Sequence, residues 1–246
     1  MGHETMTDPT LRVMCARALM EVANPVARTF AEQSGRSVDL VFGTVGALQA
    51  KLDAGETADI VVLSAQHIER LEQAGLLDRA NCRTVGSTGI GVAVREGAAK
   101  PDITTPQAFK ATLSAARAIA FSDPAVGGSA GIYLAGLFER MGLADMIRAK
   151  GMPQQSGGEV ARRVAEGIAD IGMTQLSEML VVPGISVVGA LPAPLGNDTV
   201  YRAAVRADSA HADAARAFVA MLIAPEARRL LVRAGFEPPA SPAGKP

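Results

Sequence analysis

Ser122-Asp-Pro-Ala-Val-Gly-Gly-Ser-Ala-Gly-Ile-Tyr133 is the stretch that best indicates the fold, because it joins two segments of different periodicity. Residues 117–121 before it form a short apolar run typical of a buried strand. Residues 130–141, which begin within it, place apolar side chains at helical spacing. The N–H groups of a first helical turn have no partner inside the helix, and the helix dipole adds positive charge there. This strand, glycine-rich turn and helix start therefore predict a place where an anion can bind.

The same arrangement occurs twice more, nearer the N-terminus. Met14-Cys-Ala-Arg-Ala18 follows an apolar segment that starts at Leu11, and Gly43-Thr-Val-Gly-Ala47 follows an alternating segment at 37–42. We expect the three helix N-termini to face one cleft and to bind an anion through neutral dipoles.

The order of the patterns predicts an α/β chain folded into two lobes. Strand and helix patterns alternate up to residue 74, which requires a parallel sheet covered by helices. Two long extended segments, 85–95 and 197–206, are expected to cross between the lobes, with the ligand cleft between them and closure about the crossings as the expected motion. The predicted division is lobe I at 11–87 plus 200–237, lobe II at 88–199, and disordered tails at 1–10 and 238–246.

Composition argues for a soluble globular protein and against several function classes. The 246 residues are 48% hydrophobic and 20% charged, with a formal net charge of -1. Aromatic residues make up only 4% and no Lys/Arg-rich run occurs, which argues against nucleic acid as a partner. Cys15 and Cys82 give no disulfide framework, and the three histidines are isolated, so we expect no metal centre and no cofactor.

The first ten residues are polar and contain no apolar signal-peptide segment. As written, the chain is expected to be cytoplasmic and not inserted in a membrane. A periplasmic protein is expected instead if the natural sequence has an export signal that is missing here.

The chain resembles the molybdate-binding family of solute-binding proteins, which has the type II periplasmic binding protein fold. The resemblance runs in order from about Leu11 to Glu237. It implies parallel-rich sheets flanked by helices, an interlobe cleft for a small anion, and, for an exported protein, a transporter permease as partner. The motifs that support it are Phe42-Gly-Thr-Val-Gly-Ala-Leu48, Ala54-Gly-Glu-Thr-Ala-Asp-Ile-Val-Val-Leu63, Ser122-Asp-Pro with Ala130-Gly-Ile-Tyr133, and Ile171-Gly-Met-Thr-Gln175.

The resemblance also implies where the ligand is held, and there this chain departs from the family. Family members hold the oxyanion with serines in the first and second turns, amides of the third, and a tyrosine after a late strand. Here the first serine position is Ala18 and the tyrosine position is Gln175. The ligand-binding positions predicted in this way are Ala18, Thr44, Val45, Gly46, Ser129, Ala130, Gly131 and Gln175, to which we add Arg17 and Ser177 as donors on the expected cleft wall.

Arg17 changes the expected ligand, because a carboxylate accepts the paired N–H groups of a guanidinium, whereas an oxyanion wrapped in neutral donors needs none. The segment Gly127-Gly-Ser-Ala-Gly-Ile132 followed by Gln175-Leu-Ser-Glu178 is similar to a side branch of the family that includes an isomerase of cis- and trans-aconitate.

Three residues are candidates for the base that such an isomerase needs: Cys15, Glu178 and Glu159. The favoured interpretation of Cys15 is nevertheless a small buried hydrophobe, and that of the two glutamates is a surface or capping carboxylate. Two functions stay open at this stage. One is a solute-binding protein that presents an anion to a transporter. The other is a cytoplasmic isomerase that moves a double bond in a small di- or tricarboxylate.

Overall fold

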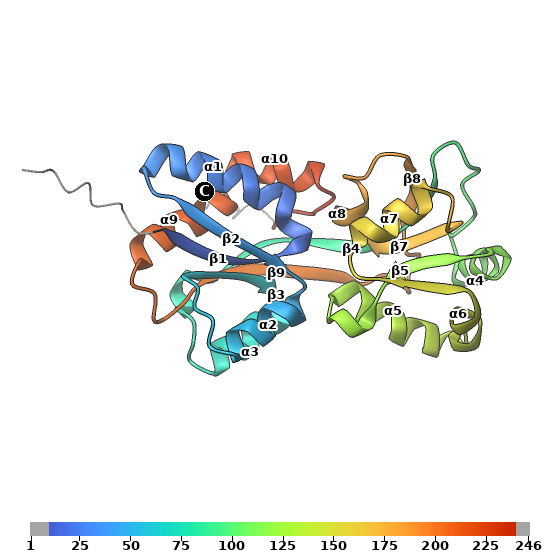
Figure 1. Ribbon diagram of the computed structural model, residues 1–246, viewed down its shortest axis with the longest axis horizontal. Coiled ribbons are helices and arrows are strands. Elements are labelled where there is room, and N and C mark those ends of the chain that lie inside the picture. The colour runs from blue at the N-terminus through green and yellow to red at the C-terminus, as the bar shows by residue number, and fades with distance from the viewer. Residues whose placement is uncertain (1–9, 240–246) are drawn as a thin grey trace, which may run out of the picture.

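The computed structural model describes residues 10–239, which form one mixed nine-stranded sheet with helices on its faces (Figure 1). The strands are β1 (Leu11–Ala16), β2 (Val38–Gly43), β3 (Ile60–Ser64), β4 (Arg83–Arg95), β5 (Ile119–Ser122), β6 (Gly151–Gln154), β7 (Ile171–Gln175), β8 (Ile185–Ala190) and β9 (Asp198–Val205). The α-helices are α1 (Met20–Ser34), α2 (Val45–Asp53), α3 (Ala65–Gln73), α4 (Pro106–Ala115), α5 (Ser129–Arg140), α6 (Ala144–Lys150), α7 (Gly157–Ala165), α8 (Leu176–Met179), α9 (Ala212–Leu222) and α10 (Pro225–Arg233). Three short 3-10 helices are η1 (Arg17–Leu19), η2 (Arg79–Asn81) and η3 (Pro124–Val126).

The strands follow the spatial order β2-β1-β3-β9-β4-β7-β5-β6, and β8 also pairs with β4. β1 is parallel to β2 and β3, and β5 is parallel to β6 and β7, as alternating strand and helix patterns predict. β4 and β9 are antiparallel to the strands beside them. The carboxyl ends of the two parallel groups consequently face each other across the middle of the molecule.

The lobes are joined by the two extended segments that the sequence predicts to cross between them. In β4, residues 83–89 pair with β9, whereas residues 90–95 pair with β7 and β8. β4 is therefore a member of both halves of the sheet, and β9 lies beside it as the chain returns to lobe I (Figure 1).

Each lobe has a hydrophobic core of its own. One cluster of buried side chains draws on residues 11–85 and 201–236, including the edge-to-face pair Phe30 and Phe218 with ring centroids 5.5 Å apart. A second cluster draws on residues 90–195 and includes Phe121 and Phe138 at 5.4 Å. Because each core is buried inside one lobe, relative motion of the lobes need not expose either of them.

The sequence did not predict α6 or β6. β6 is the edge strand of lobe II, and Pro153 is tolerated there because one side of an edge strand has no ladder to complete. At the other end of the chain, Glu237 exchanges backbone hydrogen bonds with Ser87 of β4. The disorder predicted for the tails concerns residues that lie outside the described range, apart from Thr10 and residues 238–239. No helix within 10–239 combines the length and apolar character needed to cross a membrane.

Candidate functional site

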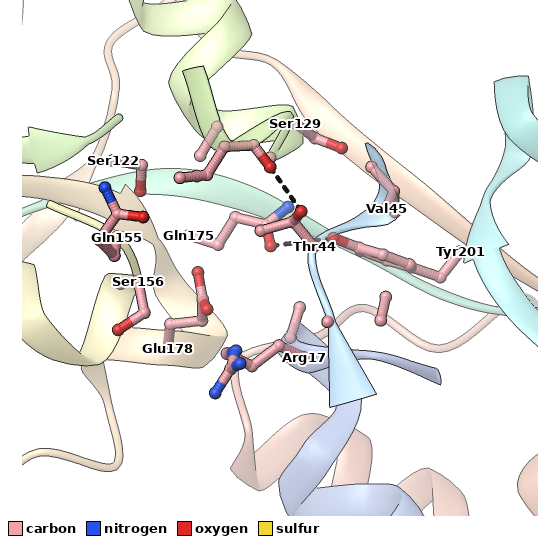
Figure 2. A pocket seen from close by; sticks show the side chains of 17 residues that line it. Arg17, Thr44, Val45, Ser122, Ser129, Gln155, Ser156, Gln175, Glu178 and Tyr201 are labelled. Carbon is pink, nitrogen blue, oxygen red and sulfur yellow. Dashed lines mark hydrogen bonds between the residues drawn. The ribbon is translucent and has the colours of Figure 1, made fainter. Parts of the chain in front are cut away.

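A small pocket with a cavity volume of about 40 Å³ lies between the lobes, where strands end and helices begin (Figure 2). Lobe I contributes the end of β1 with η1, the β2–α2 turn, and Tyr201 of β9. Lobe II contributes the end of β5, the turn before α5, the start of α7, and the junction of β7 with α8. Helix N-termini thus reach the pocket from both sides, and all three predicted turns contribute to it.

Arg17 and Ala18 line the pocket directly after β1. The guanidinium of Arg17 points toward the carboxyl of Glu178 on the opposite lobe (Figure 2). Arg17 is exposed, and among residues 10–239 no carboxylate comes within ion-pairing distance of it. Its donors are therefore open to a ligand in the cleft.

The β2–α2 turn holds the lobes together as well as lining the pocket. Thr44 caps α2 by accepting a hydrogen bond from the Ala47 N–H (3.1 Å), and its own hydroxyl donates to the Val126 carbonyl of lobe II (2.6 Å). The Gly46 N–H donates to the Gly127 carbonyl (3.1 Å). The structure is therefore closed, with hydrogen bonds directly from lobe to lobe.

This contact corrects the role predicted for Gly46. Thr44 and Val45 line the pocket, but Gly46 does not, because its amide proton is bonded to Gly127. A Cβ at Gly46 would lie 3.0 Å from both Cα and O of Gly127, which itself has a positive φ of 69°. Two glycines are needed here so that the backbones of the two lobes can touch.

The third predicted turn contributes Ser129 and Ala130, whereas Gly131 faces away from the pocket. A Cβ at Gly131 would lie 2.7 Å from the Asp123 carbonyl oxygen and 2.8 Å from that of Ser122. The absence of a side chain at Gly131 consequently serves the close packing of α5 against the end of β5 and not the approach of a ligand.

Gln175 presents a donor that has no protein partner. The Tyr201 hydroxyl donates to Oε1 of Gln175 (2.9 Å), so the Nε2 group must be on the other side of the amide. That Nε2 is buried and makes no hydrogen bond. Burial raises the pKa of Tyr201, which keeps its hydroxyl protonated as the donor. A buried polar group without a partner, on the wall of a pocket, is what a ligand acceptor would satisfy.

Glu178 places a carboxyl group inside this otherwise donor-rich pocket. Burial raises the pKa of Glu178, and three weaker effects lower it: a hydrogen bond from the Thr174 hydroxyl, the charge of Arg17, and the backbone N–H of Gly157. The Thr174 hydroxyl lies 3.2 Å from Oε2 of Glu178 and 2.8 Å from the hydroxyl of Ser122. A carboxyl whose pKa is raised in a cleft is a candidate acid or base.

The other candidate bases and one candidate donor lie elsewhere. Cys15 is fully buried behind the pocket, its thiol donates to the Ala16 carbonyl, and burial raises its pKa, so its position does not suit a nucleophile or base. Glu159 lies outside the pocket, where it accepts from the Gln155 N–H (3.1 Å) and faces Arg162 (3.9 Å). Ser177 is buried with its hydroxyl unpartnered, but it does not line the pocket.

Nine residues that line the pocket are not among the predicted site residues: Ala16, Gly43, Ser122, Val126, Gly128, Gln155, Ser156, Gly157 and Tyr201. Ser156 caps α7 by accepting from the Glu159 N–H (3.3 Å), so α7 brings a further helix N-terminus to the site. The run Gln155-Ser-Gly-Gly158, which precedes a helical pattern, indicates this helix start in the sequence. It has the same serine and glycine chemistry as the other turns before helices that line the pocket.

Within residues 10–239 no group of three or more His, Cys, Asp or Glu side chains is placed to hold a metal ion. The pocket therefore offers, from the protein itself, one guanidinium, neutral donors from side chains and helix starts, and one carboxyl. This set can bind a small anion and exchange a proton with it.

Comparison with known proteins identifies the family and the fold. Residues 11–237 match the family model described as bacterial extracellular solute-binding protein. Aconitate isomerase from Pseudomonas sp. is 34% identical over 242 residues, which cover 95% of this chain and 90% of that protein. The periplasmic molybdate-binding protein of Azotobacter vinelandii has a TM-score of 0.74 at 23% identity, covering 93% of this chain and 99% of its own. The sulfate-binding protein SubI of Mycobacterium tuberculosis has a TM-score of 0.74 at 20% identity, covering 96% and 88%. The predicted fold class and family resemblance are thereby confirmed.

Proposed function

The chain belongs to the bacterial extracellular solute-binding protein family, and we propose that its cleft binds a small unsaturated polycarboxylate and moves the double bond within it. The substrate class that fits is an aconitate-type tricarboxylate, converted between its cis and trans forms. The observation on which this rests is the carboxyl of Glu178 inside a pocket that is otherwise built to attract an anion.

An ionised carboxylate in a pocket that only binds an anion would repel the ligand. Burial raises the pKa of Glu178, which favours its protonated form more than water does. A general base works best when its pKa is near the working pH. Glu178 therefore costs anion affinity but supplies acid–base chemistry.

The proposed reaction is an allylic proton transfer. The carboxylate of Glu178 removes a proton from the methylene carbon of the substrate: the C–H bond breaks and an O–H bond forms on Glu178. The electron pair spreads over the three-carbon allylic unit and its carboxylates. The O–H bond of Glu178 then breaks, its proton adds to the carbon that began as the vinyl carbon, and the carboxylate is restored as the double bond moves by one position. No atom is gained or lost, and the new double bond forms in either geometry.

We assign to Arg17 and Gln175 the role of hydrogen-bond donors that stabilise the negative charge of the substrate. The Arg17 guanidinium is open to the cleft and offers a paired donor to one substrate carboxylate, while the unpartnered Nε2 of Gln175 offers a donor from the opposite lobe. Fixed donors aimed at a developing negative charge lower the barrier to proton removal from carbon. The full-length relative named aconitate isomerase supports the same substrate class.

The second candidate is a protein that binds an anion without changing it and presents the closed lobes to a transporter permease. It is favoured by the family itself and by the direct hydrogen bonds between the lobes, Thr44 to Val126 and Gly46 to Gly127, which are suited to trapping a ligand. In this function Glu178 would bind in its protonated form as a hydrogen-bond donor.

Proton NMR on a panel of carboxylates separates the two functions. With protein at about a hundredth of the substrate concentration, the isomerase converts one isomer of aconitate to the other over many turnovers. A binder leaves every spectrum unchanged, and a thermal-shift screen of carboxylates, molybdate and sulfate then identifies its ligand by a raised Tm.

A further inference from the structure

Three side chains connect two separate points of the pocket wall through the protein interior. Ser122 at the end of β5 and Glu178 on α8 both line the pocket. Between them is Thr174 of β7, which is completely buried and does not reach the pocket. Its hydroxyl oxygen lies 2.8 Å from the Ser122 hydroxyl and 3.2 Å from Oε2 of Glu178.

When both hydrogen bonds among Ser122, Thr174 and Glu178 are made, the number of available protons allows only two directions of donation along this hydrogen-bonded series. Each hydroxyl has one proton to donate. While Glu178 is ionised it can only accept, so Thr174 donates to Glu178 and Ser122 donates to Thr174. In that state Ser122 shows only its lone pairs to the pocket. Once Glu178 is protonated on Oε2, this O–H can donate to Thr174, Thr174 can donate to Ser122, and the Ser122 proton is released toward the cleft.

We propose that Ser122, Thr174 and Glu178 form a switch that turns Ser122 into a hydrogen-bond donor to the substrate at the moment when Glu178 takes up the substrate proton. Only hydroxyl rotations are involved, and no proton passes along the chain. This inference rests on the proposed isomerisation. In it, Ser122 touches the substrate and Thr174 is a positioning residue that acts through its two neighbours.

The timing is what makes such a switch useful. Substrate deprotonation adds a negative charge to the bound molecule, and the same event frees the Ser122 proton. An interaction made with the charged intermediate but not with the bound substrate accelerates the reaction without tightening substrate binding. A hydrogen bond to a charged group is expected to change the rate by about 10- to 100-fold.

The packing around Thr174 keeps the chain intact. A Cβ at Gly157 of α7 would lie 2.5 Å from the Thr174 hydroxyl oxygen, and equally close to Oε2 of Glu178. The ionisable groups that face Glu178 are Arg17 from η1, whose charge favours the ionised carboxylate, and Tyr201 from β9, which burial keeps neutral. The positions of Arg17 and the Gly157 N–H are the same for both directions of hydrogen-bond donation. The switch therefore consists of the three side chains alone.

The test is the full-length Thr174→Val variant, which keeps the shape of the buried side chain and removes its hydroxyl, with Thr174→Ser as the matched control. In Thr174→Val the Ser122 proton is free at all times. We expect kcat for aconitate to fall about 10- to 100-fold and KM to decrease by a similar factor, because Ser122 now binds the substrate itself as well as the charged intermediate. Thr174→Ser is expected to stay within about threefold of the wild type.

Rates are compared on the pH-independent plateau, because loss of the Thr174 hydrogen bond raises the pKa of Glu178 further. Ser122→Ala is expected to lower kcat without improving KM, and adding Thr174→Val to it should lower kcat no further. Two results overturn the switch: kcat of Thr174→Val within twofold of the wild type, or a lowered kcat with a raised KM that Thr174→Ser shares.

If the wild type does not convert aconitate, the proposed function fails, and the switch is measured through binding alone. Calorimetry with citrate from pH 5.5 to 8.5 is the probe. Thr174→Val should bind citrate more tightly than the wild type at high pH, where Glu178 is ionised, and the difference should vanish as the pH falls. A ratio of affinities that does not depend on pH contradicts the switch.

Discussion

The direct contact between the two lobes leads to the prediction that Gly46→Ala prevents closure while leaving each lobe folded. A Cβ at Gly46 would lie 3.0 Å from Cα and O of Gly127, which is tighter than nine in ten real Cβ contacts and requires a shift of a few tenths of an ångström. Neither atom belongs to a flexible side chain, so the two lobes must move apart at this point.

Separation breaks the two hydrogen bonds that join these turns, from the Gly46 N–H to Gly127 and from the Thr44 hydroxyl to Val126. Each is worth about 0.5–1.5 kcal/mol, so the closed state loses about 1–3 kcal/mol. A ligand that binds the closed cleft must supply that free energy, and its affinity should fall about 5- to 150-fold.

Isothermal titration with citrate measures this loss. Gly158→Ala is the matched control, because a Cβ there would have only the Ser156 hydroxyl at 4.0 Å near it. The control should bind like the wild type, and both variants should unfold within a few degrees of it, since neither site is part of a hydrophobic core. A Gly46→Ala protein that binds as tightly as the wild type would refute the assignment of this contact to closure.

Individual contacts of the pocket lead to four further predictions. Tyr201→Phe leaves the Gln175 amide without the donor that orients it, so citrate affinity should weaken about 3- to 10-fold by calorimetry, and an unchanged affinity would remove Tyr201 from the account. Glu178→Gln should abolish isomerisation and yet raise Tm at pH 8: the raised pKa of Glu178 means that its ionised form destabilises the fold above that pKa, so the Tm gain should shrink toward pH 4. For the wild type the same shift predicts that kcat/KM falls with decreasing pH at a value above about 4.3, the ordinary pKa of glutamate. Arg17→Ala should weaken citrate binding by about tenfold or more. It should also move the fall of kcat/KM to higher pH, because the Arg17 charge lowers the pKa of Glu178. If that fall occurs at the same pH as in the wild type, Arg17 does not influence the titration of Glu178.

The sequence predicted the turns of the site better than the individual atoms that form it. Periodicity located β1, β2 and β5 with the helices that follow them, and parallel pairing then brought their ends to one cleft. The local sequence pattern does not distinguish a glycine that is approached by a ligand from one that is approached by another segment of the backbone. Gly46 meets Gly127 and Gly131 meets Asp123, and both contacts depend on how the elements pack.

The parts of the site that the sequence missed depend on long-range pairing. Ser122 and Thr174 are 52 residues apart and meet because β5 pairs with β7. Tyr201 reaches Gln175 because β9 and β7 pair with successive parts of β4. The Ser156 turn was overlooked because the edge strand before it, with Pro153, has neither an apolar run nor a strand alternation. Glu178 was among the candidates, but its chemistry depends on burial, which no spacing reveals.

The central claim is that this cleft converts its ligand by means of Glu178, and one time course tests it most directly. Proton NMR follows cis-aconitate and, separately, trans-aconitate with wild-type protein at about one part in a hundred, beside the Glu178→Gln variant. The wild type should bring both samples to the same ratio of isomers, while Glu178→Gln should leave each unchanged. Two spectra that never change with the wild type, or equal conversion by the variant, would contradict it.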